Sequence, residues 1–156
     1  MCAILLAVVL LQYLFFVKLK EVVGLGLNND ELRANDRLDR YLVHNLNRSP
    51  EIPLASAAFD TVAIVVSVQY LIRPYEVFQS IYRLLKPAGQ CIVIMSNRMF
   101  PSKAIHAFQI LTTSEKIALI QDYMEKGNFS KTEFIDRSPP GANPLWVVRG
   151  EKTQKA

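Results

Sequence analysis

The sequence predicts one α/β domain built on an open, mostly parallel, Rossmann-like sheet, with helices on both faces and a C-terminal antiparallel hairpin. Strand-like and helix-like segments alternate from residue 21 onward, which is typical of parallel sheets. The strongest strand, residues 59–68, is a continuous apolar run and must therefore be covered on both faces. Two strand-like segments close the chain around a proline-rich loop, as in a hairpin.

Composition supports a single globular domain and argues against several function classes. The chain has 156 residues and is 51% hydrophobic, which excludes a disordered chain. Its net charge of +4 is spread along the sequence, and acidic residues interleave with Arg33, Arg37 and Arg40. We therefore expect a solvated surface and no nucleic-acid binding. Two cysteines and two isolated histidines predict no metal site and indicate a reducing, intracellular and cytoplasmic location.

The N-terminal segment, residues 1–20, differs from the rest of the sequence. Its first 17 residues carry no charge. A helix of that length would span about 25 Å, against a bilayer hydrocarbon core of about 30 Å. Three alternatives stay open: a membrane anchor through residues 1–17 that holds the domain on the cytoplasmic side, a buried core element, and a cleaved signal.

The main domain is expected over residues 21–152, followed by a short tail over 153–156. It begins with a strand over 21–28 and a short helix for which Asn29 is the expected N-cap. A second strand follows over 39–47, and the prolines and small residues after it predict a loop.

Residues 59–68 predict the central strand. Pro74, in a first-turn position, predicts a helix over 73–86 that ends at Pro87 and Gly89. The next strand is expected over 90–97.

Two further helices are expected over residues 103–111 and 114–127, the second capped by Ser114 and stopped by Gly127. His106 lies on an apolar helical face, so we expect it to be packed rather than catalytic. The closing hairpin strands are expected over 129–136 and 144–151.

The block "FDTVAIVVSVQYLIRPYEVFQSIYRLLKPAGQCIVIMSNRMFP", residues 59–101, resembles the fourth strand, fourth helix and fifth strand of class I S-adenosylmethionine-dependent methyltransferases of the type 11 kind. The Leu-Lys-Pro-Ala-Gly turn at residues 85–89 is its most specific piece, and the similarity extends over about residues 21–152. The resemblance implies that S-adenosylmethionine is the cofactor and that its methyl group goes to a small-molecule acceptor.

The resemblance also implies where the site lies, since ligands of open α/β sheets bind beyond the carboxyl ends of the strands. Helix capping remains the alternative role for Asn28 and Asn29, and a turn the alternative for Asn45. No residue is assigned as a catalytic base. The implied cofactor residues are Gly26, Asn28, Asn29, Asn45, Ser67 and Val68. The implied substrate residues are Gln69, Tyr70, Asn97, Arg98 and Phe100.

One departure from the family pattern concerns the N-terminus. The resemblance implies a first strand that ends in an acidic-Gly-x-Gly loop, and residues 1–20 contain no glycine. The domain is thus expected to be N-terminally truncated or to have lost half of its cofactor pocket, with the apolar N-terminus able to fill the slot between the second and fourth strands.

Two function hypotheses follow from this departure. One is a working methyltransferase, and the other is a non-catalytic, membrane-tethered relic or interaction protein. A dehydrogenase is disfavoured because Gly24 and Gly26 lack the third glycine of the dinucleotide fingerprint.

Overall fold

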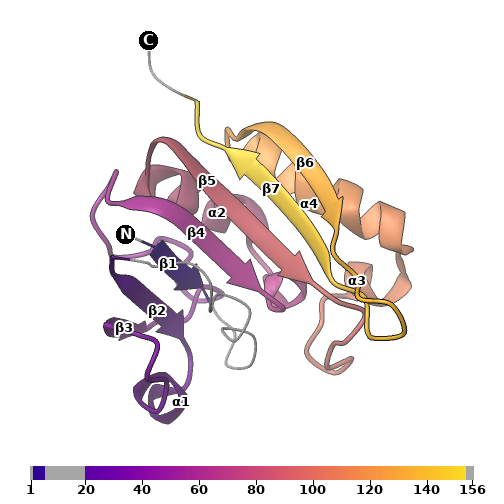
Figure 1. Ribbon diagram of the computed structural model, residues 1–156, viewed down its shortest axis with the longest axis horizontal. Coiled ribbons are helices and arrows are strands. Elements are labelled where there is room, and N and C mark those ends of the chain that lie inside the picture. The colour runs from indigo at the N-terminus through magenta and orange to yellow at the C-terminus, as the bar shows by residue number, and fades with distance from the viewer. Residues whose placement is uncertain (1, 6–19, 154–156) are drawn as a thin grey trace.

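A seven-stranded sheet forms the centre of the described part of the chain, residues 2–5 and 20–153, in a computed structural model (Figure 1). The strand order is β3-β2-β1-β4-β5-β7-β6. The strands are β1 (Cys2–Leu5), β2 (Val22–Gly26), β3 (Arg40–Val43), β4 (Phe59–Val65), β5 (Leu85–Met95), β6 (Ser130–Asp136) and β7 (Trp146–Glu151).

Strand direction confirms the predicted fold class. The neighbours from β3 to β5 all pair in parallel, whereas β7 pairs antiparallel with both β5 and β6. The last two strands are therefore the expected C-terminal hairpin, and the rest is the expected parallel α/β sheet.

The strand β1 lies between β2 and β4. The sequence alone showed no recognisable strand for this position. Cys2 pairs in parallel with Val22 on one side and with Thr61 on the other. Cys2–Leu5 is therefore an inner strand of the sheet. Among the described residues, no helix has the length and apolar content to cross a bilayer. Residues 6–17, on which the anchor depends, lie outside the described residues.

The helices come from the connections between strands. They are α1 (Asn29–Arg33), the 3-10 turn η2 (Val68–Tyr70), α2 (Pro74–Leu84), α3 (His106–Ile110) and α4 (Thr113–Lys126). Behind the sheet in Figure 1, α2 and α4 pack together, with the rings of Phe78 and Tyr123 5.9 Å apart. Val62, Phe78 and Val93 have no exposed surface, so the main core lies between these helices and β4–β5.

Several predicted element ends were wrong. The cap of α1 is Asn28 rather than Asn29, because the Asn28 side chain accepts from the amides of Asp30 and Glu31. The cap of α4 is Thr112 rather than Ser114, because Thr112 and Glu115 form a reciprocal capping box.

The strands and helices also differ in length from the prediction. β3 ends at Val43 instead of residue 47, and α3 covers only His106–Ile110 of the expected 103–111. α2 ends at Leu84, before the Pro87 that was expected to stop it, because Leu85 is already extended and begins β5. Leu85 then pairs with Phe59, and the ladder shifts register before Gln90 pairs with Thr61.

Candidate functional site

The carboxyl ends of the parallel strands meet at one edge of the sheet, where the arrowheads of β2, β4 and β5 point in Figure 1. The register places Gly26 beside Val43 and Val65 beside Ile94, so the connections after all these strands leave from one edge. All of the residues that the sequence analysis singled out as candidate site residues lie in these connections or at the end of β2. We refer to this region as the carboxyl edge.

The connection after the central strand buries polar side chains. Only three polar or charged side chains among the described residues are buried, and two of them, Ser67 and Gln69, directly follow β4. Gln69 Nε2 donates to the Val66 carbonyl at 3.1 Å, and Val68 is fully buried between them. Val66 has a φ of 47°, an outlier for a β-branched residue. Backbone strain of this kind concentrates at functional sites.

Tyr70 joins the connections that follow three different strands. Its hydroxyl accepts from the Phe100 amide at 2.9 Å, which ties the β4 connection to the β5 connection. Its carbonyl accepts from Asn47 Nδ2 at 2.9 Å, and Asn47 Oδ1 accepts from the Ile72 amide at 3.0 Å. The Ile105 amide also donates to the Gln69 carbonyl at 3.0 Å. The substrate candidates Gln69, Tyr70 and Phe100 are thus brought together.

Asn47 is the residue of this network that sequence reasoning missed. It sits two residues after Asn45, and nothing in the sequence distinguishes the two amides. Its partners are 23 and 25 residues away, so only the folded chain shows that Asn47 bridges two connections.

The candidates after β2 and β3 are engaged in local structure. The Asn28 side chain caps α1, and Asn29 is the first helical residue. A Cβ at Gly26 would lie 3.2 Å from the Leu32 side chain, so packing of α1 accounts for this glycine. Asn45 Oδ1 accepts from the amides of Asn47 and Arg48 at 3.0 and 3.3 Å, which is an Asx turn.

The candidates after β5 are more open to solvent. Asn97, Arg98 and Phe100 are all exposed. With the Asn143 amide in the orientation that satisfies its neighbours, its oxygen accepts from Arg98 Nη2 at 3.0 Å. His106 is also exposed, so the expectation that it is packed was wrong. It opens α3 at the surface, and the buried face of that short helix is supplied by Phe108.

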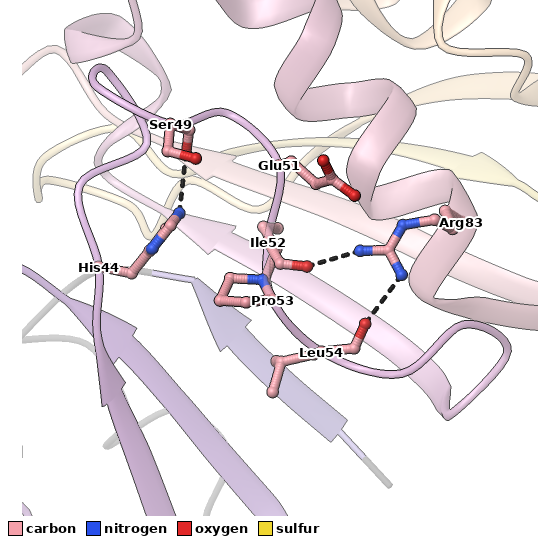
Figure 2. Close-up of a pocket in the computed structure, with 7 residues that line it drawn as sticks. All are labelled: His44, Ser49, Glu51, Ile52, Pro53, Leu54 and Arg83. Atoms are coloured by element: carbon pink, nitrogen blue, oxygen red, sulfur yellow. Dashed lines mark hydrogen bonds between the residues drawn. The ribbon is translucent and has the colours of Figure 1, made fainter.

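A pocket of about 310 Å³ lies between the loop that follows β3 and the last turn of α2, which leads into the amino end of β5 (Figure 2). Its walls include His44, whose Nε2 lies 2.8 Å from the Ser49 carbonyl oxygen. Arg83 donates to the carbonyl oxygens of Ile52 and Leu54 at 2.5 and 2.8 Å. Figure 2 shows the guanidinium directed at these carbonyls, so its role is to tie the loop to α2.

Strongly shifted titratable groups lie away from the carboxyl edge. The Lys86 ammonium, at 2.8 Å, lowers the pKa of Asp60 to about 2, and both groups are near the amino end of β4. Burial raises the pKa of the Cys91 thiol far above its usual range, so this cysteine is unreactive. Within residues 2–5 and 20–153, no cluster of His, Cys, Asp and Glu could hold a metal ion. The candidate residues at the carboxyl edge therefore offer amides, hydroxyls, main-chain groups and the guanidinium of Arg98.

The sequence model of a family described as a methyltransferase domain matches residues 7–93. No curated protein sequence matches the chain. Three solved structures illustrate the fold likeness, and at 12–15% identity they show the fold alone.

The first structure is a chain of the complex between the Haloferax volcanii Trm112 methyltransferase activator and a methyltransferase, with a TM-score of 0.72 and 14% identity over 99% of this chain and 83% of that one. The second is an S-adenosylmethionine-dependent methyltransferase from Mesorhizobium loti, with a TM-score of 0.68 and 12% identity over 96% and 89%. The third is Haemonchus contortus phosphoethanolamine N-methyltransferase 2 with S-adenosylhomocysteine, with a TM-score of 0.64 and 15% identity over 99% and 49%.

Proposed function

The chain belongs to the methyltransferase domain family, and we propose that it transfers the methyl group of S-adenosylmethionine to a small-molecule acceptor at the carboxyl edge. The observation that carries the proposal is the set of connections after β3, β4 and β5 joined around Tyr70, with Ser67 and Gln69 buried beneath. Buried polar groups next to strained backbone are typical of a binding site rather than of a strand end alone.

The side-chain amides at the carboxyl edge suit part of the cofactor. Amides such as Asn28 and Asn45 match ribose hydroxyls and the adenine edge, which need hydrogen-bond donors and acceptors without net charge. When bound, S-adenosylmethionine supplies an electrophilic methyl group on a sulfonium, and in-line displacement by the acceptor leaves S-adenosylhomocysteine. The chain's residues then need only to bind, to orient and to exclude water. Tyr70, held at both its hydroxyl and its carbonyl, is placed to orient an acceptor.

The experiment is a calorimetric titration of the folded full-length chain with S-adenosylhomocysteine, followed by the same titration on variants. Gln69→Ala and Tyr70→Ala should each weaken binding of the cofactor or, in an acceptor screen, raise the acceptor KM by about tenfold, as for a lost buried hydrogen bond. His106→Ala is the matched control at the exposed surface and should change neither. Equal, negligible effects of all three variants on a folded chain would remove these residues from the site.

A second candidate function is a non-catalytic member of the family that keeps the fold as an interaction module. It is favoured by the absence of glycine from residues 1–20, where the resemblance implies a glycine loop, and by the local hydrogen bonds that occupy the Asn28 and Asn45 side chains. A folded chain that binds no S-adenosylhomocysteine supports this second candidate. Binding at micromolar concentration supports the first.

A further inference from the structure

We propose that residues 96–112, which connect β5 to α4, form a docking surface for an anionic lipid membrane. We call these residues the docking segment. The segment includes the acceptor candidates Asn97, Arg98 and Phe100, but vesicle binding is measured without any cofactor and therefore tests the docking surface separately from methyl transfer. A chain that binds vesicles but no S-adenosylhomocysteine would leave this inference standing while the proposed function failed.

The docking segment is positively charged and has no acidic residue to balance it. No Asp or Glu occurs between Glu76 and Glu115. Arg98, Lys103 and His106 lie in this stretch. All three are exposed. Some exposed cations elsewhere pair with carboxylates, for example Arg149 with Glu133 at 2.7 Å. Among the ion pairs of the described residues none involves Arg98 or Lys103, and the amide that Arg98 contacts, Asn143, is neutral, so no carboxylate neutralises these two cations.

The same segment exposes large apolar side chains. Phe100 and Ile110 are 67% and 65% exposed, the highest values among the large apolar residues of the described chain. Ile72, whose backbone amide is fixed by Asn47 in the adjoining connection, is 64% exposed. Apolar groups that stay this exposed beside cations are typical of interaction sites.

Hydrogen bonds fix the conformation of the docking segment in which these apolar side chains are exposed. Gln109 Nε2 donates to the carbonyls of Pro101 and Ala104 at 3.1 and 2.8 Å, which folds α3 back on the loop before it. The Phe100 amide is held by the Tyr70 hydroxyl, and Lys103 Nζ lies 5.6 Å from the Phe100 ring centroid. The cation and the aromatic ring are therefore presented together on a built surface.

An anionic lipid surface satisfies both features at once. Aromatic and aliphatic side chains enter the headgroup boundary without needing a pocket of matching shape, while lysine and arginine are attracted to the acidic headgroups. An acidic protein would match the charges, but it would bury Phe100 and Ile110 only with a complementary apolar pocket. The combination of unmatched cations and outward apolar groups thus favours lipid.

The test is co-sedimentation of the full-length chain with vesicles of phosphatidylcholine alone or with 30% phosphatidylserine. We expect tighter binding to the anionic vesicles. Arg98→Gln with Lys103→Gln should weaken that binding by about 25-fold, at roughly fivefold for each basic residue. Phe100→Ser should weaken it by about tenfold through lost apolar burial. The charge-matched control, Lys126→Gln with Lys131→Gln, removes exposed cations from α4 and β6 and should change binding by less than about twofold.

Three results would overturn the proposal. One is equal binding of the unmodified chain to neutral and anionic vesicles, as expected for an apolar contact alone. Another is undiminished binding by the Arg98 and Lys103 variant or by Phe100→Ser, each with its fold verified by circular dichroism. The third is binding to soluble polyglutamate that equals vesicle binding and withstands Phe100→Ser, which would point to an acidic macromolecule instead.

Discussion

The two sides of the central strand β4 are packed to different depths. On one side, β5, α2 and α4 enclose side chains with no exposed surface, including Phe78, Ile81 and Val93. On the other side, β2 is buried along its length, but the edge strand β3 leaves Tyr41 and Val43 39% and 49% exposed, and Leu32 is the single buried residue of α1. We call these the thick side and the thin side. Among the described residues, most of the side chains with no exposed surface lie on the thick side.

This difference divides the candidate site. The proposed acceptor residues follow β4 and β5, whose strands belong to the thick side, whereas Asn28 and Asn45 follow β2 and β3 on the thin side. Asn47 bridges the two, since it comes from the β3 connection and binds the β4 connection. A ligand at the carboxyl edge would therefore contact one firmly held wall and one more easily displaced wall.

The largest expected effect tests the depth of packing directly. Phe78→Ala removes a fully buried ring that lies 5.9 Å from Tyr123 and 6.4 Å from Phe129, and should lower the free energy of unfolding by about 3–5 kcal/mol. Leu32→Ala, on the thin side, should cost about 2 kcal/mol because α1 can relax into the space. Urea denaturation followed by circular dichroism measures both. Equal costs would show that the two sides are packed alike.

A pair of glycines sharpens the same comparison. A Cβ at Gly127 would lie 2.9 Å from Phe78 Cβ, and neither helix can move away, so Gly127→Ala should cost about 1–3 kcal/mol. A Cβ at Gly24 would meet only the end of the Leu38 side chain, which can rotate, so Gly24→Ala should cost less than about 1 kcal/mol. Thermal unfolding of the two variants compares them. A larger loss of stability for Gly24→Ala than for Gly127→Ala would contradict the looser packing of the thin side.

Long apolar patterns predicted the thick side well. The continuous run over residues 59–65 had to be covered on both faces, and the strand-helix alternation around it fixed the parallel order. Helix ends were predicted less well, because neighbouring residues compete for one cap. Thr112 and Ser114 both precede a helical pattern, and only the spacing from Thr112 to Glu115 fits a capping box. That spacing was present in the sequence and would have identified the cap.

The site was harder to predict than the fold. The candidate residues lie at one edge because the carboxyl ends of parallel strands coincide, and that they form a binding site stays a prediction. It could not identify Asn47 or the Arg83 pocket, because both depend on partners more than 20 residues away whose relative positions only the tertiary structure sets. Exposure of His106 was missed for the same reason, since α3 is too short for its buried face to follow from periodicity.

Asn47→Ala should weaken the link between the thin side and the thick side at the carboxyl edge. It removes the hydrogen bonds to the Tyr70 carbonyl and the Ile72 amide, and should lower the free energy of unfolding by about 1–2 kcal/mol. Hydrogen exchange at the Ile72 amide should accelerate more than at core strands. Asn45→Ala is the matched control, because it loses only turn bonds to Asn47 and Arg48. Unchanged exchange at Ile72 in Asn47→Ala would mean that the bridge contributes nothing.

The smallest expected effect concerns the ion pair of Asp60 and Lys86, which lies near the amino end of β4, at the sheet edge opposite the carboxyl edge. The pKa of Asp60 is lowered from 3.8 to about 2, with the hydrogen bond from Lys86 as the largest of several causes, so the ionised carboxylate stabilises the folded state above about pH 4 and this contribution is lost as the pH falls towards 2. The Asp60 side chain is 58% exposed, so solvent screening limits the contribution to at most about 1 kcal/mol.

Asp60→Asn should therefore flatten the dependence of unfolding free energy on pH between about 4 and 2 while changing little else. Lys86→Gln should flatten the same interval by a smaller amount, because Lys86 is the largest but not the sole cause of the lowered Asp60 pKa, and the double variant should match Asp60→Asn. Urea denaturation at several pH values measures the three curves. If the dependence of unfolding free energy on pH stays unchanged in both single variants, other carboxylates cause the loss of stability at low pH. The difference between the two sides would then depend on burial alone and not on surface charge.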